Sequence, residues 1–182
     1  MAKDMIVSTP KGDDRQQKME AEANQFAAEI LMPTYMMSGD VRRFRAPEID
    51  HITALSEKYD VSKEAAGRRY VDFQDEPCAL VFSKNGKISY AYLSKYFPSI
   101  KVWRGDFIPV GAATKTFQAD VGGSSEWLEC SADTWLSGDR YEEVYEQVLL
   151  QEGGYRTTLL TLGEKKDEDE EKLQRSWKPG FH

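Results

Sequence analysis

The stretch KMEAEANQFAAEILMP, residues 18–33, has the pattern of an amphipathic helix with two glutamates beside its apolar stripe. Its apolar residues recur at steps of three and four, which places them on one helix face. They are Met19, Ala23, Phe26, Ala27, Ile30 and Leu31. Glu20 and Glu22 lie at the rim of this stripe, where a carboxylate can stay in solvent or reach a metal ion. The spacing alone leaves both readings open.

The surrounding residues predict a helical segment that extends to about residue 75. Asp13 or Asp14 can cap the first helix, which ends near Leu31. A second, short helix is expected over Thr34 to Phe44, with an interruption near Ser38-Gly39. Two further helices follow Pro47 and Ser62, a natural N-cap, and the last of them ends near Phe73.

Beyond residue 75 the pattern changes from helical to β. CALVFS and ISYAYL flank Asn85-Gly86, a dipeptide typical of tight hairpin turns because both central residues need positive φ. Further strands are predicted at IKVW and EWLECS, and at VYEQVLL and RTTLLTL on either side of Gly153-Gly154. The predicted fold class is α+β, with a mostly antiparallel sheet and a helix or two on one face.

Three parts are therefore expected along the chain. Residues 1–75 form a helical segment, residues 76–163 form a β-rich domain that can sense or bind, and residues 164–182 form a charged tail. Trp177 and Phe181 are aromatic residues in this polar tail, and we expect them to dock on the folded part.

Composition restricts the class of protein. The 182 residues carry a formal charge of -7 with 40% hydrophobic residues, which suits a folded domain and disfavours nucleic acid or anionic membrane as the main partner. No stretch is long and apolar enough for a membrane span, and the N-terminus does not have the pattern of a secretion signal. Cys78 and Cys130 are far apart and not in C-x-x-C spacing, so we expect two reduced, buried thiols in a cytoplasmic protein.

The wording of the first helix carries a family resemblance. EAEANQFAAEILMP closely resembles the segment that follows the zinc site in the ImmA/IrrE family of metallo-endopeptidases. LSEKYDVSKEAAGRRYVDF resembles the next pair of helices of that family, which makes the helical segment the back half of a zincin-like domain. YEQVLLQEGGYRTTLLTL and RSWKPGF resemble the carboxy-terminal domain and tail of some members.

This resemblance implies a regulatory zinc protease of the bacterial cytoplasm that cleaves a helix-turn-helix repressor and so releases stress or mobile-element genes. In the family, two histidines of an H-E-x-x-H helix and a glutamate of the following helix hold the zinc, and the Glu of the motif is the general base. By position the third ligand is carried over to Glu22, with Glu20 as the alternative. Asn24, Phe26 and Met32 would shape the helix behind that site.

The chain departs from the family in the part that does the chemistry. It contains no H-E-x-x-H, and its two histidines, His51 and His182, are unrelated in spacing. A catalytic zinc needs about three protein ligands, so we expect no zinc and no peptide cleavage from this chain alone. The first hypothesis is a truncated or split metallopeptidase whose histidine-bearing helix is on another chain or is missing, and whose substrate is a repressor.

Other readings stay open. The chain can instead be a non-enzymatic regulatory module whose β-rich domain binds a protein or a small molecule. LSEKYDVSKEAAGRRY also has the outline of a DNA-reading helix pair, with Lys63, Arg68 and Arg69 nearby. His51 is expected at the surface, on the polar side of its helix. Six aromatic residues of the β-rich half are expected in the core or around a pocket. They are Trp103, Trp127, Trp135, Tyr90, Tyr92 and Tyr96.

The apolar stripe of the first helix gives one structural expectation. If the histidine-bearing part is absent, the face with Ala23, Phe26, Ala27 and Ile30 has lost part of its cover. The N-terminal residues, the sheet domain or another copy of the chain must then cover it, and we expect a homodimer or a poorly ordered first helix.

Overall fold

The fold is known from a computed structural model, which describes residues 14–138 and 140–165. Four helices form the first part: α1 (Asp14–Leu31), α2 (Thr34–Val41), α3 (Ile49–Tyr59) and α4 (Lys63–Phe73). All four were predicted, although α2 runs through Ser38-Gly39 without interruption and ends three residues earlier than expected. The predicted cap of α4 is confirmed, because the Ser62 hydroxyl accepts a hydrogen bond from the Ala65 N–H at 3.1 Å.

The second part is a five-stranded sheet in the order β2-β1-β5-β4-β3, and every neighbouring pair is antiparallel. The strands are β1 (Cys78–Lys84), β2 (Lys87–Leu93), β3 (Leu128–Ser131), β4 (Glu143–Leu150) and β5 (Tyr155–Leu162). Asn85 and Gly86 have φ of 50° and 79°, as the β1–β2 turn requires. The predicted α+β class and the antiparallel sheet are confirmed.

The strand predicted at IKVW is wrong. These residues lie in the connection between β2 and the short helix α5 (Ala113–Thr116). Their backbone is satisfied by another loop, because Ile100 forms an isolated bridge with Leu136 and the Lys101 N–H donates to the Trp135 carbonyl at 2.8 Å. A β-type composition here serves a loop-to-loop contact and not a sheet ladder.

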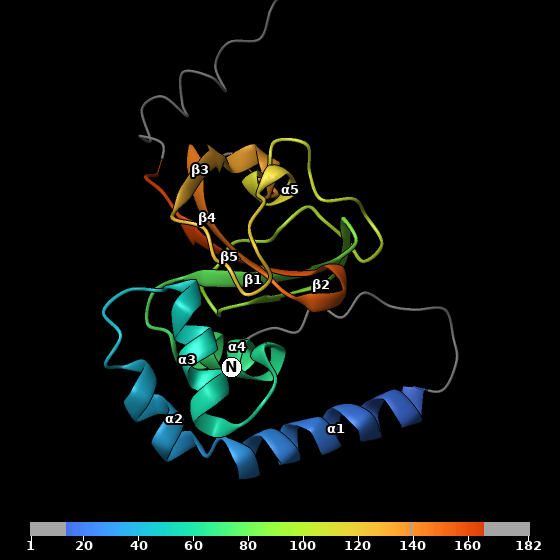
Figure 1. The fold of residues 1–182 in the computed structure, drawn as a ribbon, viewed down its shortest axis with the longest axis vertical. Coiled ribbons are helices and arrows are strands. Elements are labelled where there is room, and N and C mark those ends of the chain that lie inside the picture. Colours follow the sequence, from blue (N-terminus) through green and yellow to red (C-terminus); the bar gives the residue numbers. More distant parts are fainter. Residues whose placement is uncertain (1–13, 139, 166–182) are drawn as a thin grey trace, which may run out of the picture.

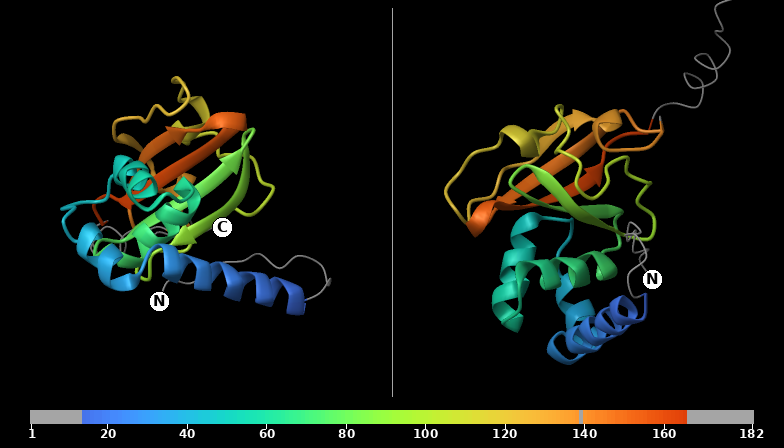
Figure 2. Two further views of the ribbon diagram at one scale, coloured as in Figure 1. Left: turned by 60° about the horizontal axis from the view of Figure 1, so that its bottom comes forward. Right: turned by 90° about the vertical axis from the view of Figure 1, so that its right-hand side faces the viewer.

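The sheet separates two layers (Figures 1 and 2). Helices α3 and α4 pack on one face, while α5 and the long connections cover the other. Alternation along β1 serves both layers, because Leu80 and Phe82 belong to the core on the helical side and Ala79 and Val81 to the core on the other side. None of the helices in the described part of the chain has the length and apolar character needed to cross a membrane.

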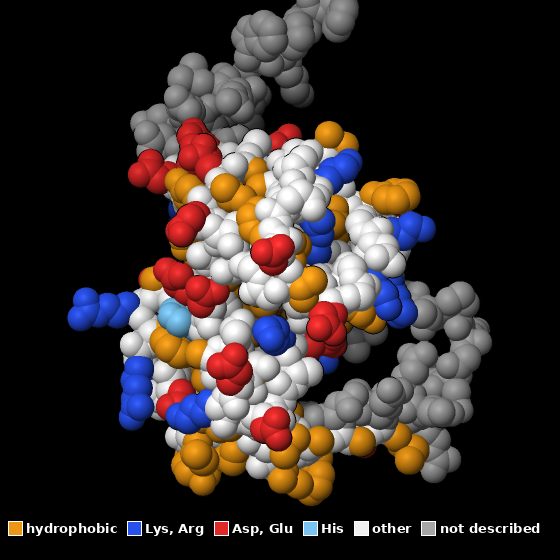
Figure 3. Space-filling model, in the orientation of Figure 1, with side chains coloured by type: hydrophobic (Ala, Val, Ile, Leu, Met, Phe, Trp, Pro, Cys, Tyr) orange, Lys and Arg blue, Asp and Glu red, His pale blue; other side chains and the backbone are white. Residues whose placement is uncertain are grey.

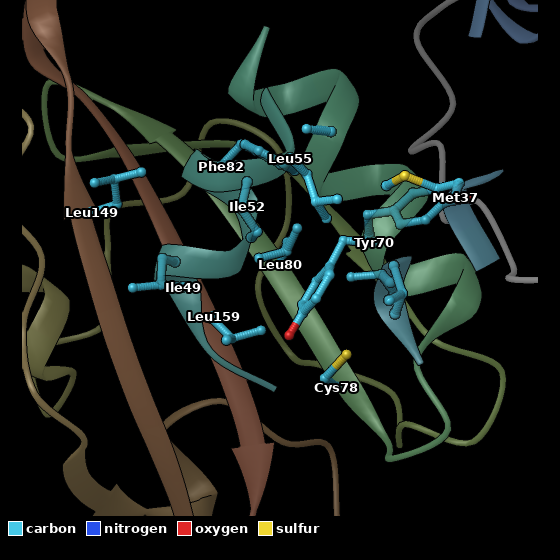
Figure 4. Packing of buried hydrophobic residues seen from close by; sticks show 14 of the residues in the cluster. Met37, Ile49, Ile52, Leu55, Tyr70, Cys78, Leu80, Phe82, Leu149 and Leu159 are labelled. Atoms are coloured by element: carbon cyan, nitrogen blue, oxygen red, sulfur yellow. The ribbon is translucent and has the colours of Figure 1, made fainter. Parts of the chain in front are cut away.

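The core between helices and sheet contains residues from both predicted parts (Figure 4). Ile52 of α3 and Tyr70 of α4 are completely buried against Leu80 of β1 and Leu159 of β5. Gly67 allows α4 to approach β1 closely, since a Cβ at this position would lie 2.8 Å from Leu80 Cδ1. The helical segment and the sheet thus share one core, while the predicted division at residue 75 stays a prediction.

Polar side chains fix the start of α3 on the sheet. The first N–H groups of a helix have no partner within it. The Ile49 N–H donates to Gln147 Oε1 on β4 at 2.8 Å, and the Glu48 N–H donates to the Tyr70 hydroxyl at 2.9 Å. Each buried donor is satisfied by an element far away in sequence, so the helix start is positioned by the sheet and by α4.

A buried carboxylate organises the opposite layer. Glu146 of β4 is completely buried. Its Oε1 accepts from the Ala113 N–H at 3.1 Å and from Trp135 Nε1 at 2.9 Å. Its Oε2 accepts from the Thr114 N–H at 3.0 Å and the Thr114 hydroxyl at 2.6 Å. These four hydrogen bonds satisfy the buried carboxyl oxygens and hold α5 against the sheet.

Candidate functional site

Helix α1 is attached to the other helices near its C-terminal end. The Glu29 carboxylate accepts from the Thr34 N–H at 2.9 Å, from the Thr34 hydroxyl at 3.0 Å and from Arg69 Nη2 at 2.8 Å. Arg69 Nη2 also donates to the Met32 carbonyl at 2.8 Å. The hydrogen bond from the Thr34 N–H is the main cause that lowers the pKa of Glu29. Figure 1 shows the helix extending away from the body beyond this attachment.

The apolar stripe of α1 is open to solvent. Phe26 is 69% exposed and Ile30 is 60% exposed, although both are large hydrophobic residues. The exposed set continues onto α2, and its large members are Met19, Phe26, Ile30, Leu31, Tyr35 and Met36. In Figure 3 these helices carry a band of hydrophobic side chains along the base of the molecule. We call this set the α1–α2 surface. From the sequence we expected the apolar face of this helix to have lost part of its cover, and in the structure that face is exposed.

The carboxylate predicted as a zinc ligand lies at the edge of this surface. Glu22 is on α1, one helical turn before Phe26, and its side chain is exposed. The structure does not describe the side chains of Glu20 and Asn24. Met32, in contrast, is buried at the foot of α1. Glu22 therefore lies beside the exposed apolar stripe of α1.

The described residues do not make a metal site by themselves. In residues 14–138 and 140–165, no group of three His, Cys, Asp or Glu side chains is placed to hold a metal ion. His182 lies outside the described residues, and His51 is on α3. A catalytic zinc needs about three protein ligands, and the exposed Glu22 can supply only one of them. The donor set within this part of the chain does not fit zinc.

The surface position predicted for His51 is wrong. Its ring stacks on Phe44 with centroids 3.7 Å apart and an interplanar angle of 10°, and its Nδ1 lies 3.0 Å from the Tyr70 hydroxyl. Burial lowers the pKa of His51, and the nearby carboxylates of Glu48 and Asp50 oppose this shift. The ring is half-buried because the loop after α2 places Phe44 over it. It is a packing residue beside the helix start.

The arginines of the DNA-like motif make contacts within the protein. Arg69 holds Glu29 and Met32, as described above, and the Arg68 guanidinium lies 5.0 Å from the centre of the Tyr92 ring. These contacts join α4 to α1 and to β2. Sequence reasoning missed this role of Arg69. The two partners are 40 residues apart, and no local pattern links them.

The cysteines and aromatic residues of the sheet are distributed as follows. Cys78 and Cys130 are free and buried, as predicted, and burial raises the pKa of the Cys78 thiol to about 12. Trp135 is completely buried, but Trp103 is half-exposed. A cleft of about 480 Å³ lies between the start of α4 and the ends of the strands. None of the six aromatic residues expected in the core or around a pocket lines this cleft, whose aromatic residues are Phe82 and Tyr155.

Comparison with known protein families identifies the helical segment. Residues 4–70 match the peptidase M78 family, the IrrE N-terminal-like domain. The resemblance to the ImmA/IrrE family of zinc metallopeptidases is therefore confirmed over this part of the chain. The match includes α1, α2 and α3, ends within α4 and does not reach the sheet. No curated protein matches the chain.

Proposed function

We propose that the helical segment is the back part of an ImmA/IrrE-type zinc metallopeptidase and that the α1–α2 surface receives a histidine-bearing helix. The observation that carries this proposal is the exposure of Phe26 and Ile30 on a helix that matches the family. Large apolar side chains gathered on one exposed face mark a place where another protein element packs. The covering element can belong to a longer form of this chain or to a separate chain.

Glu22 has the position of the glutamate ligand in this arrangement. It borders the exposed stripe, so an element that covers Phe26 also reaches the Glu22 carboxylate. Two histidines from an H-E-x-x-H helix would complete the donor set that the described residues lack. Bound zinc would activate a water for peptide hydrolysis. The substrate class that we propose, from the family, is a helix-turn-helix repressor, and the role is regulated cleavage.

Zinc analysis tests the proposal. We expect less than about 0.1 zinc per purified chain and about one zinc when it is co-expressed with a family segment that contains H-E-x-x-H. Glu22→Gln should lower zinc in the complex, whereas Glu57→Gln, which changes an exposed glutamate on α3, should not. Stoichiometric zinc in the chain alone, or equal zinc in both variants, would contradict the role of Glu22.

Analytical ultracentrifugation distinguishes a histidine-bearing segment from a second copy of the chain as the partner of the α1–α2 surface. Phe26→Asp should abolish association with the histidine-bearing segment by burying an unpaired charge in the contact. The control is Val110→Asp, since Val110 is 84% exposed on the other half of the molecule. If the chain alone is a dimer that Phe26→Asp dissociates, a second copy covers the surface. Lack of any effect of Phe26→Asp on association would remove the proposed docking role.

A further inference from the structure

One segment of the sheet half has the opposite charge to the chain as a whole. Residues 84–115 contain six cationic side chains and one acidic side chain, Asp106, so their formal charge is 6 - 1 = +5 in a chain of -7. The cations are Lys84, Lys87, Lys95, Lys101, Arg104 and Lys115, and all are exposed. Figure 3 shows Lys and Arg side chains interleaved with hydrophobic ones on the right-hand side of the upper half.

Backbone hydrogen bonds hold the turn that carries two exposed aromatic residues of this segment. The turn that carries Trp103 and Phe107 is fixed on β2, because the Gly105 N–H donates to the Ile88 carbonyl and the Ile108 N–H donates to the Gly86 carbonyl. Asp106 Oδ2 accepts from the Trp103 N–H at 2.7 Å and closes the turn. Phe107 is nevertheless 70% exposed. Because the backbone of this turn is already ordered, binding of a partner here costs little further backbone entropy.

Two lysines meet at the tip of the β1–β2 hairpin without an anion between them. Lys84 and Lys87 are direct cross-strand partners. Like charges in this position destabilise a hairpin. Among the described residues, neither lysine has a carboxylate within ion-pair distance. Lys84 Nζ instead donates to the Tyr155 hydroxyl at 2.8 Å and lies 4.2 Å from the centre of that ring, and Lys87 Nζ lies 5.2 Å from the centre of the Phe107 ring.

We infer that Lys84, Lys87, Trp103, Arg104, Phe107 and Tyr155 form a docking surface for an acidic polypeptide segment that carries apolar side chains. Carboxylates of the partner relieve the repulsion between the two lysines, and its apolar residues cover Trp103 and Phe107. The complementarity is local, since residues outside 84–115 sum to -12 (-7 minus +5). The inference concerns the sheet half and does not depend on the proposed zinc site.

A polypeptide suits this surface better than single-stranded nucleic acid. Bases stack on open aromatic faces, but Lys84 and Lys87 already contact one side of the Tyr155 and Phe107 rings. The acidic remainder of the chain also repels a dense polyanion more than a short acidic segment. The aliphatic Val110 beside the turn is highly exposed and offers a contact for apolar side chains.

Fluorescence anisotropy with a labelled peptide of about ten residues, glutamates interspersed with leucine and phenylalanine, tests the inference. We expect saturable binding below about 100 μM that weakens as salt is raised. Lys87→Glu and Phe107→Ser should each weaken it at least about tenfold. The matched controls are Lys165→Glu, an exposed lysine away from the surface, and Phe26→Ser, a phenylalanine of equal exposure on α1. They should change binding less than about twofold.

Three results would overturn the inference. One is the absence of saturable binding up to about 100 μM. Another is equal weakening by the variants and their controls. The third is tighter binding of a thymidine oligonucleotide of the same length, or of a peptide with serine in place of its apolar residues, because either shows that charge alone selects the partner.

Discussion

Helices α1 and α3 carry the same spacing of apolar residues, yet Ile52 on α3 is completely buried and Ile30 on α1 is 60% exposed. The difference lies in what each helix faces. The sheet and α4 cover the stripe of α3, whereas α1 contacts its neighbours near one end. An apolar stripe thus shows that a helix needs a partner surface, and the rest of the fold decides whether this chain supplies it.

The largest expected difference between the two helices is in stability. Ile52→Ala should lower the free energy of unfolding by about 2–5 kcal/mol, because it leaves a cavity in the shared core. Ile30→Ala should change it by less than about 0.5 kcal/mol, because that side chain is exposed. Urea denaturation of the purified chain measures both. Equal losses would mean that the stripe of α1 is covered in solution.

A pair of glycines tests how closely the covered helices are packed. Gly67→Ala should destabilise by about 1 kcal/mol or more, since the new Cβ would lie 2.8 Å from Leu80 Cδ1 and overpacking outweighs the gain in helix propensity. Gly39→Ala on α2 should stabilise by up to about 1 kcal/mol, since nothing lies within 4 Å of that position. Thermal unfolding of the two variants compares them. Stabilisation by both substitutions would show that α4 can move away from β1.

The smallest expected effect is on the pH dependence of stability, and it comes from the burial of His51 on α3. Burial lowers the pKa of His51 below 6.5 in the folded state, so the unfolded chain takes up this proton first as the pH falls. The free energy of unfolding should therefore fall from about pH 6.5 down to the folded pKa and level off below it. Urea denaturation at pH 7 and pH 5 should show a smaller loss for His51→Asn than for the unchanged chain. An identical loss in both would mean that the ring is open to solvent.

The parts of the fold that are determined by residues close together in the sequence were predictable. The helix periodicities, the Ser62 cap and the Asn85-Gly86 turn are local signals, and each appears in the structure where it was expected. The strand predicted at IKVW is absent because its composition favours a strand but its backbone pairs with the loop at Trp135. The surface position predicted for His51 was wrong because helical spacing does not show that Phe44 stacks on the ring.

The sequence predicted the helix that carries the candidate site, but it did not predict the contacts that hold this helix in place. The position of Glu22 on α1 and the exposure of the stripe followed from spacing and resemblance. The attachment of α1 by Arg69 and Glu29 joins residues 40 apart, and the Glu146 carboxylate meets donors 11 to 33 residues away. Such pairs are set by the tertiary fold, so single-sequence patterns do not contain them.

The Glu146 carboxylate has a consequence for how the sheet half comes apart. Strand β4, helix α5 and the Trp135 indole all meet at this one buried carboxyl group. Removing any one of them leaves a buried polar group without part of its hydrogen bonds, so partial opening of this layer is disfavoured. Amide hydrogens of α5, a helix of four residues, should therefore exchange with solvent as slowly as those of the central strands.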